Sequence, residues 1–157
     1  MSMETFDIAG TLKWALGLRL KTDKVFMLEH DGLTWYVDNY CARAVPTSWA
    51  CVKVPEATAG LVKTISQRVS GTGEVELHDT GNIRKSELKG KPNIQIWATP
   101  DGTEVGVRED FAKLLGKTGK LYAAERSPAE SMMCIRAEGG CPVAIVMPVR
   151  IRKEAAT

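Results

Sequence analysis

Apolar residues recur every three or four positions in three stretches of the chain, and each stretch is predicted to be a helix. The first covers residues 8–22 and contains no proline. The second is expected to open at Pro55 and Glu56, because proline suits the first helical turn and a carboxylate favours the positive end of a helix. It should close at Gly71. The third helix is short and covers residues 111–115.

Between these helices apolar and polar residues alternate, as they do in half-buried β-strands. Asp31-Gly32 separates two such runs and is a strong hairpin signal. Pro46 interrupts a later pair of runs, and Pro100-Asp101-Gly102 predicts a turn. The predicted strands are 25–29, 33–37, 43–45, 49–54, 74–79, 83–88, 94–98, 105–107, 120–125, 132–136 and a last strand that runs through 146–151.

Part of this pattern repeats along the chain. Val52 and Val54 precede the second helix as Val105 and Val107 precede the third, and a similar strand follows each helix. Such self-similarity indicates a repeated unit, although generic alternation of strands and helices would also produce it. We expect one domain, residues 1–157, with possible sub-units 4–50, 51–104 and 105–152, each of which contains a strand, a helix and several further strands.

Composition narrows the class of protein. Of the 157 residues, 44% are hydrophobic and 25% are charged, as in an ordinary globular domain. A net charge of +2 does not by itself indicate a nucleic-acid-binding protein, so any DNA contact needs basic residues gathered on one face. Charged residues interrupt every apolar run before it could span a membrane. The first ten residues hold two acidic side chains and no basic leader, which argues against a signal peptide.

The cysteines do not form a metal-binding or disulfide pattern. None of Cys41, Cys51, Cys134 and Cys141 belongs to a C-x-x-C pair, and both histidines are distant from them in sequence. Zinc sites need clustered ligands. We therefore expect four free thiols, no bound metal and a reducing, cytoplasmic location.

Signals of catalysis are weak. Gly116-Lys117-Thr118 is not a P-loop, because position 111 is phenylalanine where the motif needs glycine. His30-Asp31 and His78-Asp79 take equivalent places in the repeat, so they should sit apart rather than converge on one pocket. We therefore expect neither an enzyme nor a cofactor.

Each predicted helix carries basic residues and few acidic ones in its middle. A solvated helix face would explain any one helix, whereas all three together favour sequence-independent contact with DNA phosphates. Four tryptophans leave single-strand binding by base stacking as an alternative. The candidate DNA-binding residues are Lys13, Lys63, Arg68, Lys113 and Lys117.

The last predicted strand carries the most specific motif. Its sequence Met147-Pro148-Val149-Arg150-Ile151 resembles the C-terminal Met-Pro-Met-Arg-Leu signature of bacterial DNA sliding clamps, the β-subunit of DNA polymerase III. The preceding short helix, two strands and turn follow the same order as the last third of such a clamp. The resemblance is specific over residues 105–151 and loose over 52–104.

The resemblance implies an α+β fold of repeated β-α-β-β-β units, with the helices on one face of antiparallel sheets. It implies a homo-oligomeric ring around double-stranded DNA, which tethers a polymerase or another replication or repair partner without catalysis. The helices would line the bore. The partner's peptide would dock in a groove formed by Met147, Pro148, Val149, Arg150 and Ile151, where Val149 departs from the family's methionine. The alternative is a clamp-like phage interaction protein that binds or inhibits a host replication or defence factor.

Overall fold

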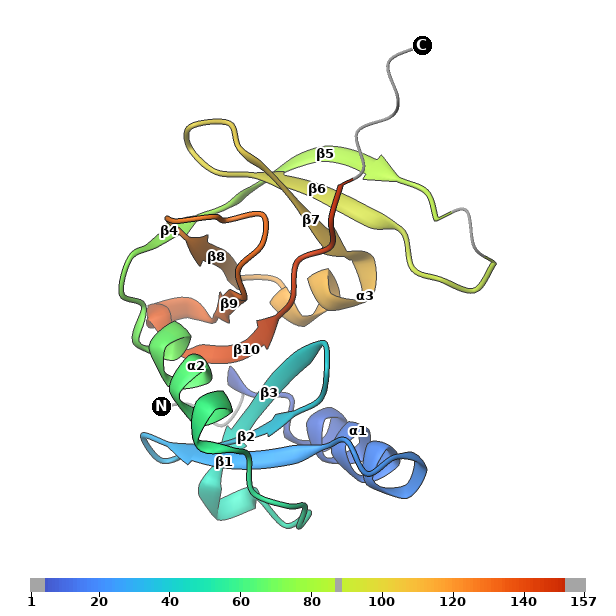
Figure 1. Cartoon of the computed structure of the whole chain (residues 1–157), viewed down its shortest axis with the longest axis vertical. Helices are drawn as coiled ribbons and strands as arrows, with labels where there is room; N and C mark the ends of the chain where they lie inside the picture. Colours follow the sequence, from blue (N-terminus) through green and yellow to red (C-terminus); the bar gives the residue numbers. More distant parts are fainter. Residues whose placement is uncertain (1–4, 87–88, 152–157) are drawn as a thin grey trace.

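The computed structural model describes residues 5–86 and 89–151, and it is a mixed α+β fold with antiparallel sheets (Figure 1). The α-helices are α1 (Ile8–Lys21), α2 (Ala59–Ser70) and α3 (Glu109–Ala112), and the 3-10 helices are η2 (Thr47–Trp49), η3 (Lys113–Leu115) and η4 (Glu138–Gly140). The strands are β1 (Phe26–His30), β2 (Leu33–Val37), β3 (Cys41–Pro46), β4 (Glu74–Glu76), β5 (His78–Arg84), β6 (Ile94–Ala98), β7 (Glu104–Arg108), β8 (Lys120–Ala124), β9 (Met133–Arg136) and β10 (Pro142–Val146).

The larger sheet, sheet A, consists of two meanders that meet in its middle. Its order is β1-β2-β3-β10-β9-β8-β4, and β3 pairs antiparallel with β10 through Arg43 and Ala144. One meander, β1-β2-β3, follows α1, and the other, β8-β9-β10, follows α3 and η3. The strands of 51–104 are divided between sheet A, which holds β4, and the smaller sheet, which holds β5 and β6. The strands of 105–152 are divided as well, because β7 belongs to the smaller sheet and β8, β9 and β10 belong to sheet A.

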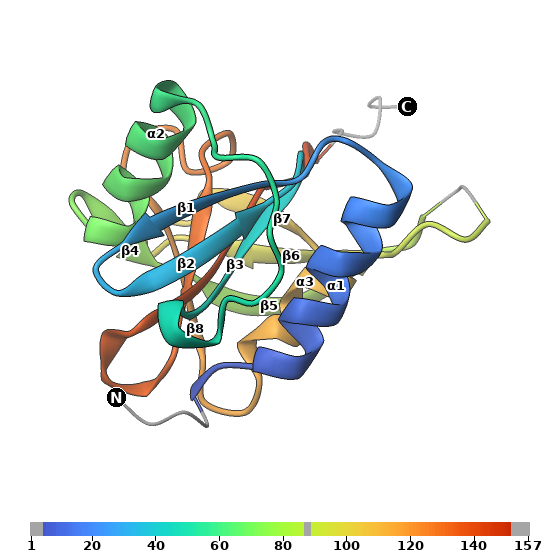
Figure 2. The same ribbon diagram turned by 90° about the horizontal axis from the view of Figure 1, so that it is seen from below.

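Neighbouring strand residues point to opposite faces of sheet A, and this alternation separates the helices. Trp35 and Ile145 belong to the core cluster that Ile65 and Val69 of α2 complete. Tyr36, next to Trp35, packs instead with Ala15 of α1. Figure 2 shows α1 and α2 on opposite sides of the β1–β3 strands. The expectation that all helices share one face is thus wrong for α2, because its apolar stripe matches the other face of the sheet.

The helix α3 lies on the same face as α1. Phe111 packs with Met133, Ile135 and Ala144, and the pairing of β10 with β3 places Ala144 beside Arg43, which is paired with Tyr36. The smaller sheet, sheet B, has the order β5-β6-β7 and covers the rest of this face through Val105 and Val107 of β7. Sequence periodicity predicted both helices, and the register of sheet A puts them on the same face.

The segment before α2 runs along an edge of sheet A instead of starting the helix. Met27 of β1 donates its backbone N–H to the Pro55 carbonyl (2.9 Å) and accepts the Ala57 N–H (2.9 Å). The helix begins at Ala59, where the Thr58 hydroxyl accepts the Leu61 N–H (3.3 Å). The prediction of a helix from Pro55 is therefore wrong, since the backbone there is occupied by β1.

The predicted strand over 146–151 is wrong in most of its length. β10 ends at Val146, and Met147 donates its N–H to the Tyr40 carbonyl (2.9 Å) outside the sheet. Pro148 has no N–H to continue a ladder. The chain then crosses to sheet B, where Val149 donates to the Gly106 carbonyl (2.8 Å). A side chain at Gly106 would overlap the Val149 carbonyl, so only glycine fits this crossing.

Local turn chemistry was predicted more accurately. Asp31 and Gly32 both have positive φ, 50° and 77°, as the tight hairpin between β1 and β2 requires. Gly71 ends α2 in the left-handed conformation with φ 78°. The predicted strand 49–54 does not form: η2 takes its start, and the Val52 carbonyl accepts a hydrogen bond from the Tyr36 hydroxyl (2.7 Å). The end of the predicted strand 83–88 lies outside the described residues.

Arg136 ties four elements together at the end of α2. Its guanidinium donates to both Glu74 carboxylate oxygens (2.9 and 3.1 Å), to the Val69 and Arg68 carbonyls (3.0 and 3.3 Å) and to the Gly140 carbonyl (3.2 Å). Arg136 is only 9% exposed. The cation thus donates to two carbonyls of the last turn of α2, one of which, that of Arg68, also accepts the Gly71 N–H (3.2 Å). Its positive charge is favourable at the negative end of the helix.

Candidate functional site

A broad groove lies over the pairing of β3 with β10, between the start of α1 and η3. Its volume is about 740 Å³. The floor comes from the two central strands of sheet A and the walls from α1, from η3 with the loop after it, and from η4. Its lining includes Asp7, Arg43, Lys113, Lys117, Glu138 and Val143.

Three of these lining residues are cations. The Arg43 guanidinium lies 4.5 Å from the Trp14 ring centroid, so α1 holds it by a cation–π contact. The Nε atom of Arg43 is buried and has no hydrogen-bond partner among the described residues. Lys113 and Lys117 are exposed, and in the described part of the chain neither makes an ion pair within 4.0 Å. The Arg43 side chain also hydrogen-bonds the Cys41 side chain. The unpaired charge that the groove offers therefore comes mainly from Lys113 and Lys117.

Two acidic residues also line the groove. The Asp7 carboxylate caps α1 by accepting the Gly10 N–H (3.0 Å), and this hydrogen bond at the positive end of the helix partly offsets its negative charge. Glu138 lies in η4 and is exposed. Formal charges along the lining still favour an anion, by three cations to two carboxylates.

A glycine-bounded loop places Lys117 in the groove. Gly116 has φ 61° and ψ −150°, a conformation essentially limited to glycine. Gly119 donates its N–H to the Leu115 carbonyl (2.9 Å), and a side chain there would overlap the Leu115 backbone. The sequence identified Gly116-Lys117-Thr118 only as an incomplete P-loop. The sequence did not predict that this loop and Arg43 would line the same groove, because their proximity depends on the pairing of β3 with β10.

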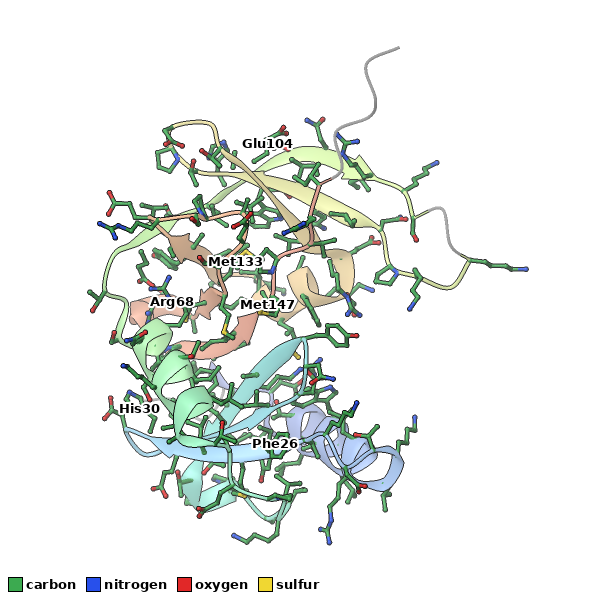
Figure 3. All side chains as sticks on the ribbon, viewed as in Figure 1. Phe26, His30, Arg68, Glu104, Met133 and Met147 are labelled. Carbon is green, nitrogen blue, oxygen red and sulfur yellow. The ribbon has the colours of Figure 1, made fainter. Side chains whose placement is uncertain are left out.

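The five predicted DNA-binding residues divide between two faces. Lys13 of α1, Lys113 of η3 and Lys117 belong to the face that carries the groove. Lys63 and Arg68 belong to α2, on the opposite face of sheet A. Figure 3 shows Arg68 at the end of α2, where its guanidinium donates to the Thr72 carbonyl (3.0 Å). The expected single basic surface is therefore not formed within one chain.

The predicted partner groove is divided as well. Met147 is half-buried at the end of β10 (Figure 3) and lines a mainly apolar hollow of about 260 Å³. Phe26, Tyr40, Leu61, Ile65 and Met132 complete much of that hollow. 

Val149, Arg150 and Ile151 line a different hollow of about 620 Å³, beside Gly106 of β7. Pro148 lies between the two groups in sequence. The five residues therefore cannot form one continuous groove, since the chain crosses from sheet A to sheet B between them.

Other candidate chemistry stays dispersed. His30 contacts its neighbour Asp31 (3.3 Å) at the end of β1 in sheet A, whereas His78 begins β5 in sheet B. All four cysteines are free thiols, and burial raises the pKa of Cys41 and of Cys134 to about 12. Among the described residues, no group of three or more His, Cys, Asp or Glu side chains is placed to hold a metal ion.

Comparison with family models, with curated proteins and with solved structures finds no match to this chain. Within residues 5–86 and 89–151, none of the helices has the length and apolar character needed to cross a membrane.

Proposed function

We propose that the protein is a clamp-like DNA-tethering protein, which oligomerises around duplex DNA and holds a replication or repair partner there. The observation that carries this proposal is the arrangement of α1 and α3 on one face of two meanders joined through β3 and β10. In each of the two halves a helix is followed by antiparallel strands, as in the repeated β-α-β-β-β units that the C-terminal resemblance implies. The sub-unit 51–104 departs from the pattern, because α2 covers the opposite face.

The α1–α3 face suits sequence-independent contact with DNA. Lys13, Lys113 and Lys117 are exposed there, and lysine binds phosphate as a mobile point charge that reads no base. In a ring this face would line the bore, and α2 with Lys63 would lie on the outside. The two lysine groups therefore have different expected roles.

A free strand edge supports self-assembly. All seven residues of β5 are exposed, and in the described part of the chain this strand pairs with β6 on one side only. Exposed edges of this kind readily pair with another chain, and head-to-tail pairing around a rotation axis closes a ring. We propose β5 as one half of the contact between copies.

Retention on circular DNA tests the proposal directly. A closed ring should stay on a nicked circular duplex in high salt and be released when the circle is cut once, because only an open end lets a ring slide off. Light scattering of the free protein should give a mass several times that of the 17.2 kDa chain. A monomer that leaves circular and linear DNA at the same salt concentration would contradict the proposal.

The hollow at Met147 favours a second candidate function, that of an interaction protein which captures an apolar peptide from a host factor. A 260 Å³ hollow lined by Phe26, Leu61 and Met147 has room for one or two apolar side chains. Methionine adapts to varied partners because its side chain is flexible and polarisable. This candidate needs no ring, so a monomeric mass in solution would favour it.

Met147→Ala should remove peptide binding at this hollow while leaving the chain folded. Met147 is half-buried, so truncation should cost less than the roughly 2–5 kcal/mol of a fully buried methionine. Peptides selected from a displayed library on the wild-type protein provide the probe. Val149→Ala is the matched control, because Val149 lines the other hollow. Equal loss of binding in both variants, or a large fall in melting temperature for Met147→Ala, would assign Met147 to the core.

A further inference from the structure

We propose that the groove between α1 and η3 is a specific seat for a phosphoryl group, with room beside it for an attached nucleoside. Arg43 would be the hydrogen-bonding residue, and Lys113 and Lys117 would supply charge. The inference rests on the proposed function for its expectation that the phosphoryl group belongs to DNA. The seat itself depends on the groove alone, so a free nucleotide is the other source of the same chemistry.

Arg43 has an unusual environment at the floor of the groove. A buried N–H without an acceptor destabilises a fold, and the Nε atom of Arg43 is in that state although the side chain also hydrogen-bonds Cys41. The side chain is nonetheless held in place, because β3 fixes its backbone and Trp14 lies 4.5 Å from its guanidinium. Because the Nε atom is buried, a phosphate oxygen would reach it only if the guanidinium turned toward the groove. Arginine would then bind the phosphate with two parallel hydrogen bonds.

The loop after η3 places two further hydrogen-bond donors at the groove. Glycines at 116 and 119 are required by its backbone, and between them stand Lys117 and Thr118, both of which line the groove. The loop thus holds an ammonium group and a hydroxyl group at the same groove as Arg43, where both can donate to an anion.

Size and polarity decide the ligand class. A groove of about 740 Å³ is far larger than a phosphate ion needs and lies within the range of about 300–1,000 Å³ of ligand sites. Apolar atoms of Phe6, Val143 and Ala144 line it beside the cations. Mixed polarity of this kind suits a nucleoside next to a phosphoryl group better than a fully hydrated anion.

The experiment follows the Arg43 Nε–H resonance by NMR during titration with inorganic phosphate, with dAMP and with a blunt duplex that lacks terminal phosphates. Saturable shifts of this resonance are expected with dAMP, and with the duplex if internal phosphates use the seat. Lys117→Gln should weaken dAMP binding roughly tenfold, as loss of one charge-assisted contact does. Lys53→Gln, an equal charge change at an exposed site outside the groove, should change it less than about twofold.

The outcomes separate this inference from the proposed function. If dAMP shifts Arg43 and the duplex does not, the seat stands and its ligand is a free nucleotide. If the protein is retained on circular DNA while none of the three ligands shifts the Arg43 resonance, tethering stands and the seat is wrong. Arg43→Lys keeps the charge but loses the paired donors, so unchanged dAMP affinity in that variant would also overturn the assignment to Arg43.

Discussion

Replacing Arg136 with methionine is expected to lower the free energy of unfolding by about 3–5 kcal/mol, the cost of breaking a buried ion pair from one side. Arg136 and Glu74 have side chains only 10% and 16% exposed, so water cannot take over their interaction. The change would also leave the Val69 carbonyl at the end of α2 without this donor. Urea denaturation followed by circular dichroism measures the loss as a lower transition midpoint.

Two further variants make the result specific. Arg126→Met removes an exposed arginine after β8 and should change stability by no more than about 0.5 kcal/mol. The double variant Glu74→Met with Arg136→Met should be more stable than Arg136→Met alone, because it leaves no buried carboxylate without a cation. If Arg136→Met lowers the free energy of unfolding no more than Arg126→Met does, the Arg136 contacts with β4, α2 and η4 contribute nothing measurable to stability.

The double variant Lys113→Gln with Lys117→Gln is expected to weaken duplex binding and to lower the salt slope by about two units, roughly one for each lost phosphate contact. Both lysines are exposed, so the fold should survive the change. Fluorescence anisotropy of a labelled duplex, measured from low to moderate salt, gives both the affinity and the slope.

The matched control for this pair lies outside the groove, and one of its two lysines is on the opposite face of sheet A. Lys53→Gln with Lys63→Gln removes the same charge from exposed positions, and Lys63 is on α2. Its salt slope should stay at the wild-type value if the α1–α3 face holds DNA. An equal fall in both double variants would point to diffuse attraction instead of a defined face. A fall in the Lys53 and Lys63 pair alone would place DNA on the α2 side.

Residue periodicity and local turn chemistry determined most of the secondary structure. The helix predicted over 8–22 is α1, and the hairpin predicted at Asp31-Gly32 joins β1 to β2. Gly71 ends the second helix as expected. These features depend on short stretches of chain, in which apolar spacing and positive-φ residues leave few alternatives.

Tertiary structure decided the features that depend on distant strands. Pro55 suited a helix start, but the backbone groups of Pro55 and Ala57 form hydrogen bonds with Met27 of β1 instead. The sequence identified Lys113 and Lys117 as candidates, whereas Arg43 became one only when β3 paired with β10 beneath them. The same pairing sets which face each helix covers, and so separates Lys63 from the groove. A shift of one residue in strand register reverses the face of every side chain in that strand. Local sequence patterns do not specify which distant strands pair, so these features depend on the tertiary structure.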